Sequence, residues 1–261
     1  MSTPLFIRSF WDLHETPPVA NLQVASRLGY DGFEAGWTVW RDDADFAARV
    51  TESGLIPICQ GWMETTHDFE VQMNTALRAG AKLFNAHAGH DSWTVTQAVQ
   101  TLGDWIQRAR AAGQALAFET HRGRCLYHPS TTAKIARQLP DLRLTADYSH
   151  FACVTESLLE RHAEALAVLA PRVDYLHARV GWNEGPQVSD PRTPQNLPYV
   201  ERFETMWDEI RAARPGYALP VCAEFGPWPY QPYDPATHTP LANVAEIIEW
   251  MRTRLSARWK D

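Results

Sequence analysis

Cysteine is scarce in this sequence, and no two cysteines have the spacing of a metal-binding or redox motif. The chain has four of them, Cys59, Cys125, Cys153 and Cys222, and none belongs to a CxxC motif. Each lies in or beside an apolar stretch, as reduced and mostly buried thiols do in cytoplasmic proteins. We therefore predict a cytoplasmic protein without a disulfide framework and without a cysteine-based structural zinc site.

Long uncharged apolar runs are also missing. No segment reaches about 18 apolar residues without a charge, so the sequence predicts no membrane span. The first residues, Met1 to Phe10, lack a basic region followed by an apolar core, and a signal peptide is not expected. Linkers and low-complexity segments are absent from the 261 residues, so we predict one domain over residues 1–261.

An excess of positive charge is the third absence. The formal net charge is −7, and an acidic surface repels phosphate backbones, so nucleic acid is not an expected partner. A glycine-rich loop of the kind that cradles phosphate is missing too, which leaves open whether a substrate carries phosphate. The oligomeric state stays open as well, a homo-oligomer included.

What the sequence does contain is a repeat of two alternating segments. A short apolar, β-prone run is followed by a stretch rich in Ala, Leu, Arg and Gln, which predicts βαβ units and a parallel sheet. The predicted strands are Leu5–Trp11, Gly32–Trp37, Leu55–Gly61, Lys82–Gly89, Ala115–His121, Arg143–His150, Val173–Val180 and Leu219–Gly226. The predicted helices are Val19–Leu28, Ala44–Ser53, Phe69–Ala79, Thr94–Ala112, Thr131–Gln138, Ser157–Leu169, Tyr199–Ala213 and Leu241–Leu255. Such a series fits a single (β/α)8 TIM barrel, which takes about 250 residues.

Two of the connections are long. Gly181–Pro198 follows the seventh predicted strand, and Pro227–Pro240 follows the eighth with the sequence PWPYQPYDPATHTP. Both leave the carboxyl ends of strands, which form the active-site face of this fold. Long loops inside compact domains are usually functional, so we expect these two to cover the site. Decoration of the surface or a subunit contact is the alternative.

Acidic and imidazole side chains lie near the ends of four consecutive strands. Buried parallel strands should be apolar throughout, yet the fifth to eighth predicted strands carry Glu119, Asp147, His177 and Glu224. Inward-facing residues of neighbouring strands meet near the axis of a closed barrel, and clustered carboxylates repel one another unless a cation lies between them. We therefore predict one divalent cation bound by these four side chains.

Three carboxylates and one imidazole form a hard, oxygen-rich donor set. Such a set favours Mn²⁺. Mg²⁺ is an alternative, and the nitrogen ligand also admits Co²⁺ and Zn²⁺. The sequence thus predicts a metal-dependent enzyme.

The strand-end pattern resembles that of the sugar phosphate isomerase/epimerase superfamily, whose barrel is also called xylose isomerase-like. That family has Glu on strand five, Asp on strand six with His three residues later, His on strand seven and Glu on strand eight. Here the corresponding residues are Glu119, Asp147 with His150 in DYSH, His177 and Glu224. The resemblance covers nearly the whole chain and rests on this pattern rather than on a long motif.

The resemblance implies a role for each matching residue. Glu119, Asp147, His177 and Glu224 would bind the metal, and His150 would hold substrate oxygens. In family epimerases the glutamates of strands five and eight also move protons on opposite faces of the sugar. The implied catalytic pair is therefore Glu119 and Glu224.

Four further polar residues are candidates for the substrate pocket. Glu34 in GFEAGW lies where the family often has a Glu near the site, and His87 in NAHAGH ends the fourth predicted strand. A structural hydrogen-bonding role is the alternative for both. Many family epimerases have a substrate-binding Arg several residues past the strand-seven His, whereas Arg179 lies only two residues past His177. We expect Arg179 and His121 to bind hydroxyls of a small-molecule carbohydrate.

Tryptophan is frequent, with 11 residues. Its large flat ring packs well in cores and also offers one polar handle. Three tryptophans lie in predicted helices and are expected to pack there: Trp105, Trp207 and Trp250. Four follow predicted strand ends, where the ring could stack on the apolar face of a sugar: Trp37, Trp62, Trp182 and Trp228.

These observations predict a metal-dependent sugar isomerase or epimerase. A divalent cation polarises a carbonyl, one carboxylate removes the neighbouring carbon-bound proton, and another returns it through an enediolate. The alternative in the same site is a lyase or dehydratase that expels a β-substituent from a keto-sugar or keto-cyclitol. A nuclease of the endonuclease IV type needs more ligands and a basic groove, which the net charge of −7 disfavours. A non-catalytic carbohydrate-binding barrel is disfavoured by the intact ligand pattern.

Overall fold

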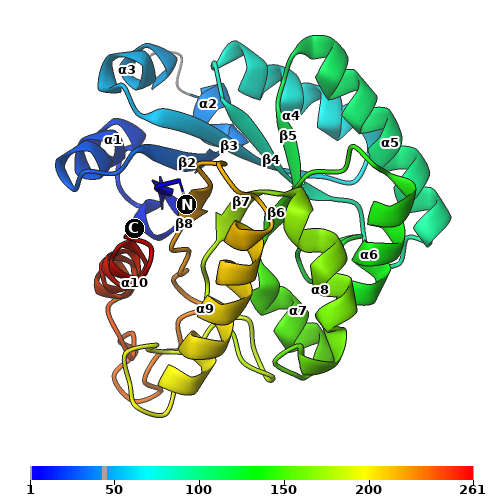
Figure 1. Cartoon of the computed structure of the whole chain (residues 1–261). Helices are drawn as coiled ribbons and strands as arrows, with labels where there is room; N and C mark the ends of the chain where they lie inside the picture. Colours follow the sequence, from blue (N-terminus) through cyan, green and yellow to red (C-terminus); the bar gives the residue numbers. More distant parts are fainter. Residues whose placement is uncertain (1, 43–45, 261) are drawn as a thin grey trace.

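The computed structural model describes residues 2–42 and 46–260 and contains eight parallel strands closed into a barrel. Each strand pairs with the next one in the sequence, and the last pairs with the first. Helices surround the strands (Figure 1). The strands are β1 (Leu5–Ser9), β2 (Gly32–Gly36), β3 (Ile56–Met63), β4 (Leu83–Ala88), β5 (Leu116–Glu119), β6 (Leu144–Ala146), β7 (Val173–His177) and β8 (Pro220–Cys222). The predicted (β/α)8 TIM barrel is confirmed.

The helices follow the strands around the outside of the barrel, from α1 after β1 to α10 after β8 (Figure 1). Among the described residues, no helix is long and apolar enough to cross a membrane. The α-helices are α1 (Pro18–Arg27), α2 (Trp37–Asp42), α3 (Phe46–Ser53), α4 (Thr66–Arg78), α5 (Val95–Ala112), α6 (Pro129–Gln138), α7 (Tyr148–Thr155), α8 (Ala163–Leu169), α9 (Leu197–Ala212) and α10 (Val244–Arg258). Short 3-10 helices are η1 (Trp11–Leu13), η2 (Glu160–His162) and η3 (Ala170–Arg172).

Seven of the eight strands end earlier than the sequence predicts, whereas β3 ends two residues later, at Met63. At β6 and β2 a helix follows the shortened strand directly. A sixth strand is expected over Arg143–His150, whereas β6 stops at Ala146 and α7 follows at once. The reason is local: Asp147 Oδ1 accepts a hydrogen bond from the Ser149 backbone N–H at 3.0 Å and so caps α7. Trp37, expected as the last residue of the second strand, instead begins α2.

The helix bounds also differ from the expectation, most clearly in two places. The helix predicted over Ser157–Leu169 forms only after Leu159, as η2 and α8. Leu159 has a left-handed φ of 66°, which a right-handed helix cannot include. The helix predicted over Ala44–Ser53 corresponds to α3, which begins at Phe46. Residues 44 and 45 of that prediction lie outside the described residues.

The apolar layer between strands and helices contains the helical tryptophans. Trp105 of α5 is fully buried, and its ring stacks on Phe69 of α4 with centroids 4.9 Å apart and planes 2° apart. Its indole N–H donates to Thr66 Oγ1 at 3.2 Å, so the buried polar atom is satisfied. Trp207 of α9 is also fully buried, and Trp250 of α10 packs partly buried against the same core. Their packing role is confirmed.

The inside of the barrel changes from apolar to polar along the strands. Six buried side chains fill its lower part: Ile7, Ile58, Leu83, Ala117, Tyr175 and Cys222. Residues two apart on a strand face the same side. Two positions further on, the same six segments carry only polar residues: Ser9, Gln60, Asn85, Glu119, His177 and Glu224. The barrel therefore presents a polar layer at the carboxyl ends of its strands, above a packed apolar floor.

The loop after β7 is tied to the end of β8 by one buried side chain. Gln187 Nε2 donates to the Gly226 carbonyl at 3.1 Å, and Gln187 Oε1 accepts from the Gly226 N–H at 2.8 Å. Gly226 also lies against the ring of Trp11, since a Cβ placed on it would be 2.1 Å from that ring. These contacts hold the ends of β1, β7 and β8 together at the mouth of the barrel.

We expect Trp105→Ala to lower the free energy of unfolding by about 3–5 kcal/mol, because it removes a fully buried aromatic side chain from a stacked pair. Chemical denaturation followed by circular dichroism measures the change. Trp228→Ala is the matched control: that side chain is 63% exposed, so its variant should stay within about 1 kcal/mol of wild type. Equal losses in the two variants would contradict this account of the core.

Candidate metal centre

The four predicted metal ligands come together above the apolar floor of the barrel. Glu119 is the last residue of β5, Asp147 directly follows β6, His177 is the last residue of β7, and Glu224 lies two residues past β8. One ligand atom from each lies within 4.8 Å of the other three. All four side chains belong to residues that are at most 3% exposed. Side chains from four separate strand ends thus form one buried donor group.

His177 Nδ1 lies close to two carboxylates without making a hydrogen bond to either, as atoms that bind the same cation do. This atom lies 2.9 Å from Glu224 Oε2 and 3.5 Å from Glu119 Oε2. It nevertheless has no partner with hydrogen-bond geometry, although it is fully buried. Two donors on one octahedral cation with bonds of about 2.1 Å are roughly 3 Å apart. The position of this nitrogen therefore fits a ring that faces a cation together with the two carboxylates.

Glu34 of β2 holds the other side of the His177 ring. His177 Nε2 lies 2.9 Å from Glu34 Oε2, which also accepts a hydrogen bond from the Tyr175 hydroxyl at 2.6 Å. Asn85 Nδ2 donates to Glu34 Oε1 and to Glu119 Oε2, both at 2.9 Å. A carboxylate that accepts the N–H at Nε2 leaves a lone pair on Nδ1, which is how metal-binding histidines are commonly oriented.

Arg179 is the one arginine in contact with the donor group among the described residues. Its Nη2 donates to Asp147 Oδ2 and to Glu224 Oε2, both at 2.6 Å. The guanidinium also lies against the rings of Trp11 and Tyr230, 5.2 Å and 4.9 Å from their centroids. Arg179 thus neutralises part of the negative charge and fixes the orientation of two of the carboxylates.

Both candidate proton-transfer glutamates are kept ionised by their surroundings. Burial alone would raise the pKa of Glu119, but the facing rings of His87 and His177 bring it well below its usual value. Burial is likewise outweighed at Glu224, whose pKa is lowered by His177 and Arg179. Two carboxylates that stay deprotonated in a buried site are available both as ligands and as proton acceptors.

Two members of the group hold their protons more strongly. Burial raises the pKa of Asp147, and the charges of Glu224 and Glu119 add to this effect against the attraction of Arg179. Burial opposes a charge on His177, but Glu224, Glu34 and Glu119 outweigh it and raise the pKa of the ring well above its usual value. Below these raised pKa values, a cation that binds at the two residues competes with protons.

A cavity of about 600 Å³ opens next to the donor group. Five residues predicted to bind substrate line it: Glu34, Trp62, His87, His121 and Arg179. Trp62 is 42% exposed and stacks on His87 with ring centroids 5.1 Å apart and planes 18° apart. Glu119 and Glu224 line the same cavity. Both glutamates are therefore accessible to a small molecule in this space.

Four other substrate-binding candidates lie away from the cavity wall. His150 is fully buried behind His121, with ring centroids 3.8 Å apart. Trp37 packs partly buried at the start of α2, under the guanidinium of Arg41. The loop tryptophans are exposed: Trp182 lies against Gly185, and Trp228 is 63% exposed with its ring 5.6 Å from that of Tyr233. The tertiary arrangement thus separates Trp62 from the other three tryptophans that follow strand ends.

Sequence reasoning missed several residues of the site. Trp11 and Tyr230 line the cavity, and both rings lie against Arg179, while Asn85 links Glu34 to Glu119. Two signals were available: Trp11 ends the first predicted strand, and Asn85 lies two residues before His87 on the same inward face. Tyr230 belongs to the second long loop, and nothing in the loop sequence singles it out. Because Tyr230 lines the cavity, one of the two long loops reaches the site.

The donor group fits a divalent cation. Three carboxylates and one imidazole nitrogen converge from four buried residues, and one of their atoms, His177 Nδ1, has no hydrogen-bond partner. The oxygen-rich set matches the preference of hard cations such as Mn²⁺ and Mg²⁺.

By sequence, the chain matches no protein-family model and no curated protein. By structure it is similar to several solved barrels. The probable 3-DHS dehydratase AsbF from Bacillus anthracis gives a TM-score of 0.67 at 12% identity, over 97% of this chain and 98% of that one. The 3-keto-D-glucoside 4-epimerase YcjR from E. coli gives a TM-score of 0.63 at 14% identity, over 96% and 100% of the chains.

A third similar structure is a xylose isomerase-like TIM barrel protein from Mycobacterium smegmatis in complex with magnesium. Its TM-score is 0.61 at 14% identity, over 100% of both chains. AP endonuclease and endonuclease IV structures match as well. Identities this low show a shared fold, so the protein is a xylose isomerase-like TIM barrel in architecture, and the reaction has to be argued from the site.

We expect Glu34→Gln to weaken Mn²⁺ binding by roughly 10–100-fold, because the carboxylate that orients His177 is lost while all four ligands remain. Isothermal titration calorimetry with Mn²⁺ measures the change. Tyr175→Phe is the matched control, since it removes one hydrogen bond to Glu34 and keeps the contact between carboxylate and imidazole. Wild-type affinity in Glu34→Gln would show that Glu34 does not orient the ring.

Metal binding should tighten as the pH rises. The pKa values of His177 and Asp147 are both raised, so below those values a proton occupies each ligand and competes with the cation. The Mn²⁺ affinity should therefore rise by up to about tenfold per pH unit for each proton displaced, and level off above the two pKa values. Calorimetry in buffers of different ionisation enthalpy counts the released protons. A pH-independent affinity without proton release would rule out this competition.

Proposed function

We propose that this protein is a divalent-metal-dependent sugar isomerase or epimerase that moves a proton next to a carbonyl through an enediolate. One observation carries the proposal: Glu119 and Glu224 are both buried, both have lowered pKa values, and both belong to one donor group beside a small-molecule cavity. Proton removal and return need two such carboxylates within reach of one carbon atom.

Glu119 has a free oxygen for proton transfer. Its Oε2 accepts a hydrogen bond from Asn85 at 2.9 Å, whereas its Oε1 has no hydrogen-bond partner. The fixed oxygen holds the carboxylate in place, and the free oxygen can accept a proton from a carbon in the cavity. Glu224 Oε2 faces the same ring nitrogen of His177 as Glu119 Oε2, and Glu224 lines the same cavity, so it can exchange a proton with the same substrate.

Glu119, Asp147, His177 and Glu224 would hold the cation. The cation supplies a positive charge that polarises the substrate carbonyl and stabilises the enediolate. Arg179 keeps Asp147 and Glu224 oriented, and Glu34 keeps the ring of His177 oriented, so these ligands need not reorganise during turnover.

The cavity wall favours a small polyhydroxylated substrate. The exposed face of Trp62 offers a flat apolar surface for a sugar ring. Arg179 and His121 line the same space; Arg179 can donate hydrogen bonds to hydroxyl groups, and His121 Nε2 can accept them. The absence of a glycine-rich phosphate loop from the sequence leaves the phosphorylation of the substrate undecided, and both forms belong in an activity screen.

A lyase or dehydratase is the second candidate. The same proton removal next to a carbonyl leads to elimination if the substrate carries a leaving group one carbon further on. Similarity to a probable 3-DHS dehydratase and to a 3-keto-glucoside epimerase gives equal fold-level support to both outcomes. A nuclease is disfavoured by the net charge of −7, because a DNA groove needs basic residues.

The proposal is tested by solvent exchange in D₂O. Wild-type protein with Mn²⁺ should introduce deuterium at the α-carbon of its substrate, screened among ketoses and 3-keto-glycosides by NMR, which also distinguishes epimers from elimination products. Glu119→Gln, with metal occupancy restored by excess Mn²⁺, should lose about 10²–10⁴-fold of the exchange rate because the proton acceptor is gone.

Glu184→Gln serves as the control for this experiment. Glu184 is exposed in the loop after β7 and contacts Asn183 there, so its variant should exchange at the wild-type rate. Undiminished exchange in fully metallated Glu119→Gln would show that Glu119 is not the base. Failure of every carbonyl substrate to exchange in wild-type protein would overturn the reaction class.

A further inference from the structure

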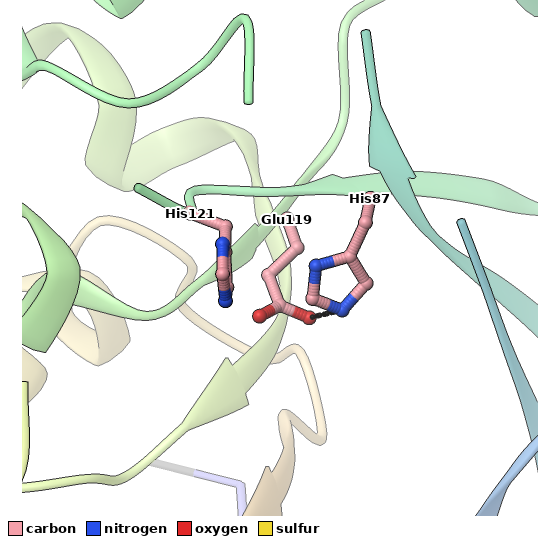
Figure 2. Close-up of side chains that lie close together, drawn as sticks. All are labelled: His87, Glu119 and His121. Atoms are coloured by element: carbon pink, nitrogen blue, oxygen red, sulfur yellow. Dashed lines mark ion pairs between the residues drawn. The ribbon is translucent and has the colours of Figure 1, made fainter. Parts of the chain in front are cut away.

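A second group of ligand-type side chains lies beside the first and shares one residue with it. His87 of β4, Glu119 of β5 and His121, two residues past Glu119, each offer one ligand atom within 4.8 Å of the other two. Figure 2 shows the two rings on either side of the Glu119 carboxylate. The predicted four-ligand centre includes only Glu119 from this group, so the two histidines have no assigned partner in it.

His87 is a buried ring without a hydrogen bond. It is 4% exposed, and neither of its ring nitrogens has a partner with hydrogen-bond geometry. Its Nε2 is nevertheless 3.0 Å from Glu119 Oε2, the contact drawn as a dashed line in Figure 2. A buried imidazole that makes no hydrogen bond is costly. Close approach without hydrogen-bond geometry is what two atoms show when they face the same cation, as at His177 Nδ1.

His121 is held in the tautomer that a metal ligand needs. Its Nδ1 lies 2.6 Å from the backbone carbonyl of Arg122. A carbonyl oxygen only accepts, so Nδ1 carries the proton and Nε2 keeps a lone pair. Metal-binding histidines are typically fixed in this way by an outer carbonyl or carboxylate.

We propose that His87, His121 and Glu119 form a second divalent-cation site, one that takes a nitrogen-preferring ion of the Zn²⁺ class. Two imidazoles and one carboxylate match the donor set of open zinc sites, which keep a further position for water or substrate. All three side chains line the cavity, so an ion has a path in and its open position faces the substrate space. The site shares Glu119 with the proposed centre but does not depend on the proposed reaction.

The two sites differ in chemistry. The four-ligand centre offers three carboxylates and one nitrogen, whereas the second site offers two nitrogens and one carboxylate. Hard ions such as Mn²⁺ and Mg²⁺ prefer the first set, while Zn²⁺, Co²⁺ and Ni²⁺ accept imidazole-rich sets. The protein should therefore bind different numbers of ions depending on the metal supplied: one with Mn²⁺ and two with Zn²⁺.

The experiment measures metal content of the full-length protein by mass spectrometry after equilibrium dialysis against Zn²⁺ or Mn²⁺. Wild type should hold about two Zn²⁺ but about one Mn²⁺ per chain. His87→Gln and His121→Gln should each fall to about one Zn²⁺ and keep their Mn²⁺. His14→Gln is the matched control, because His14 lines the same cavity outside both ligand groups and should leave the zinc content unchanged.

Asp147→Asn separates the two sites. It alters the four-ligand centre only, so it should lose Mn²⁺ and keep about one Zn²⁺, bound at His87 and His121. Co²⁺ gives a second readout, because it absorbs visible light much more strongly in a tetrahedral, nitrogen-rich site than in an octahedral oxygen site. That absorption should disappear in His121→Gln and persist in Asp147→Asn.

Some outcomes would overturn the second site without touching the proposed function. These are one Zn²⁺ per wild-type chain, or unchanged zinc content in folded His87→Gln and His121→Gln. Thermal unfolding checks that each variant is folded; if His87→Gln is not, the less buried His121 carries the test. Loss of Mn²⁺ binding from the wild type would instead contradict the four-ligand centre and leave the zinc result to stand alone.

Discussion

The structure depends on the burial of four carboxylates in one polar layer inside the barrel. Glu34, Glu119, Asp147 and Glu224 are each at most 3% exposed. Buried negative charges at such short distances repel one another unless positive charge and hydrogen-bond donors surround them. The facing strands supply such groups, above all the rings of His177 and His87 and the guanidinium of Arg179, and the cavity opens on what remains of the negative charge. Affinity for cations is thus built into the layer itself.

The barrel tolerates these buried carboxylates because each strand keeps its apolar packing residues apart from its polar site residues. The lower residues, such as Ile7 and Leu83, fill the barrel as an apolar floor, and the polar layer begins two residues later. The floor excludes water from below, while outer packing such as the stack of Trp105 on Phe69 fixes the helices around the strands. Chemistry at the open end can then vary without loss of the core.

Glu119 lies where the oxygen-rich and the nitrogen-rich groups of the layer meet. It contacts His177 in the first group and lies between His87 and His121 in the second. Its charge state, its hydrogen bond from Asn85 and its free oxygen therefore decide how the layer divides between metal binding and proton transfer. An ion in the second site would share this carboxylate with the first, which would couple zinc occupancy to the basicity of Glu119.

The sequence by itself determined the barrel and the choice of candidate ligands, because alternating segments and acidic residues at strand ends are local patterns. It could not determine which strand-end residues share a space. The predicted sixth strand ends early because Asp147 caps a helix, Trp62 enters the cavity while Trp228 faces solvent, and Tyr230 arrives from a loop with no periodicity. His87 and His121 come together on opposite sides of Glu119. Glu34 orients the ring of His177, although the two residues are far apart in the sequence. Only the closure of the barrel decides these contacts, since the strand tilt and stagger set which inward-facing side chains meet.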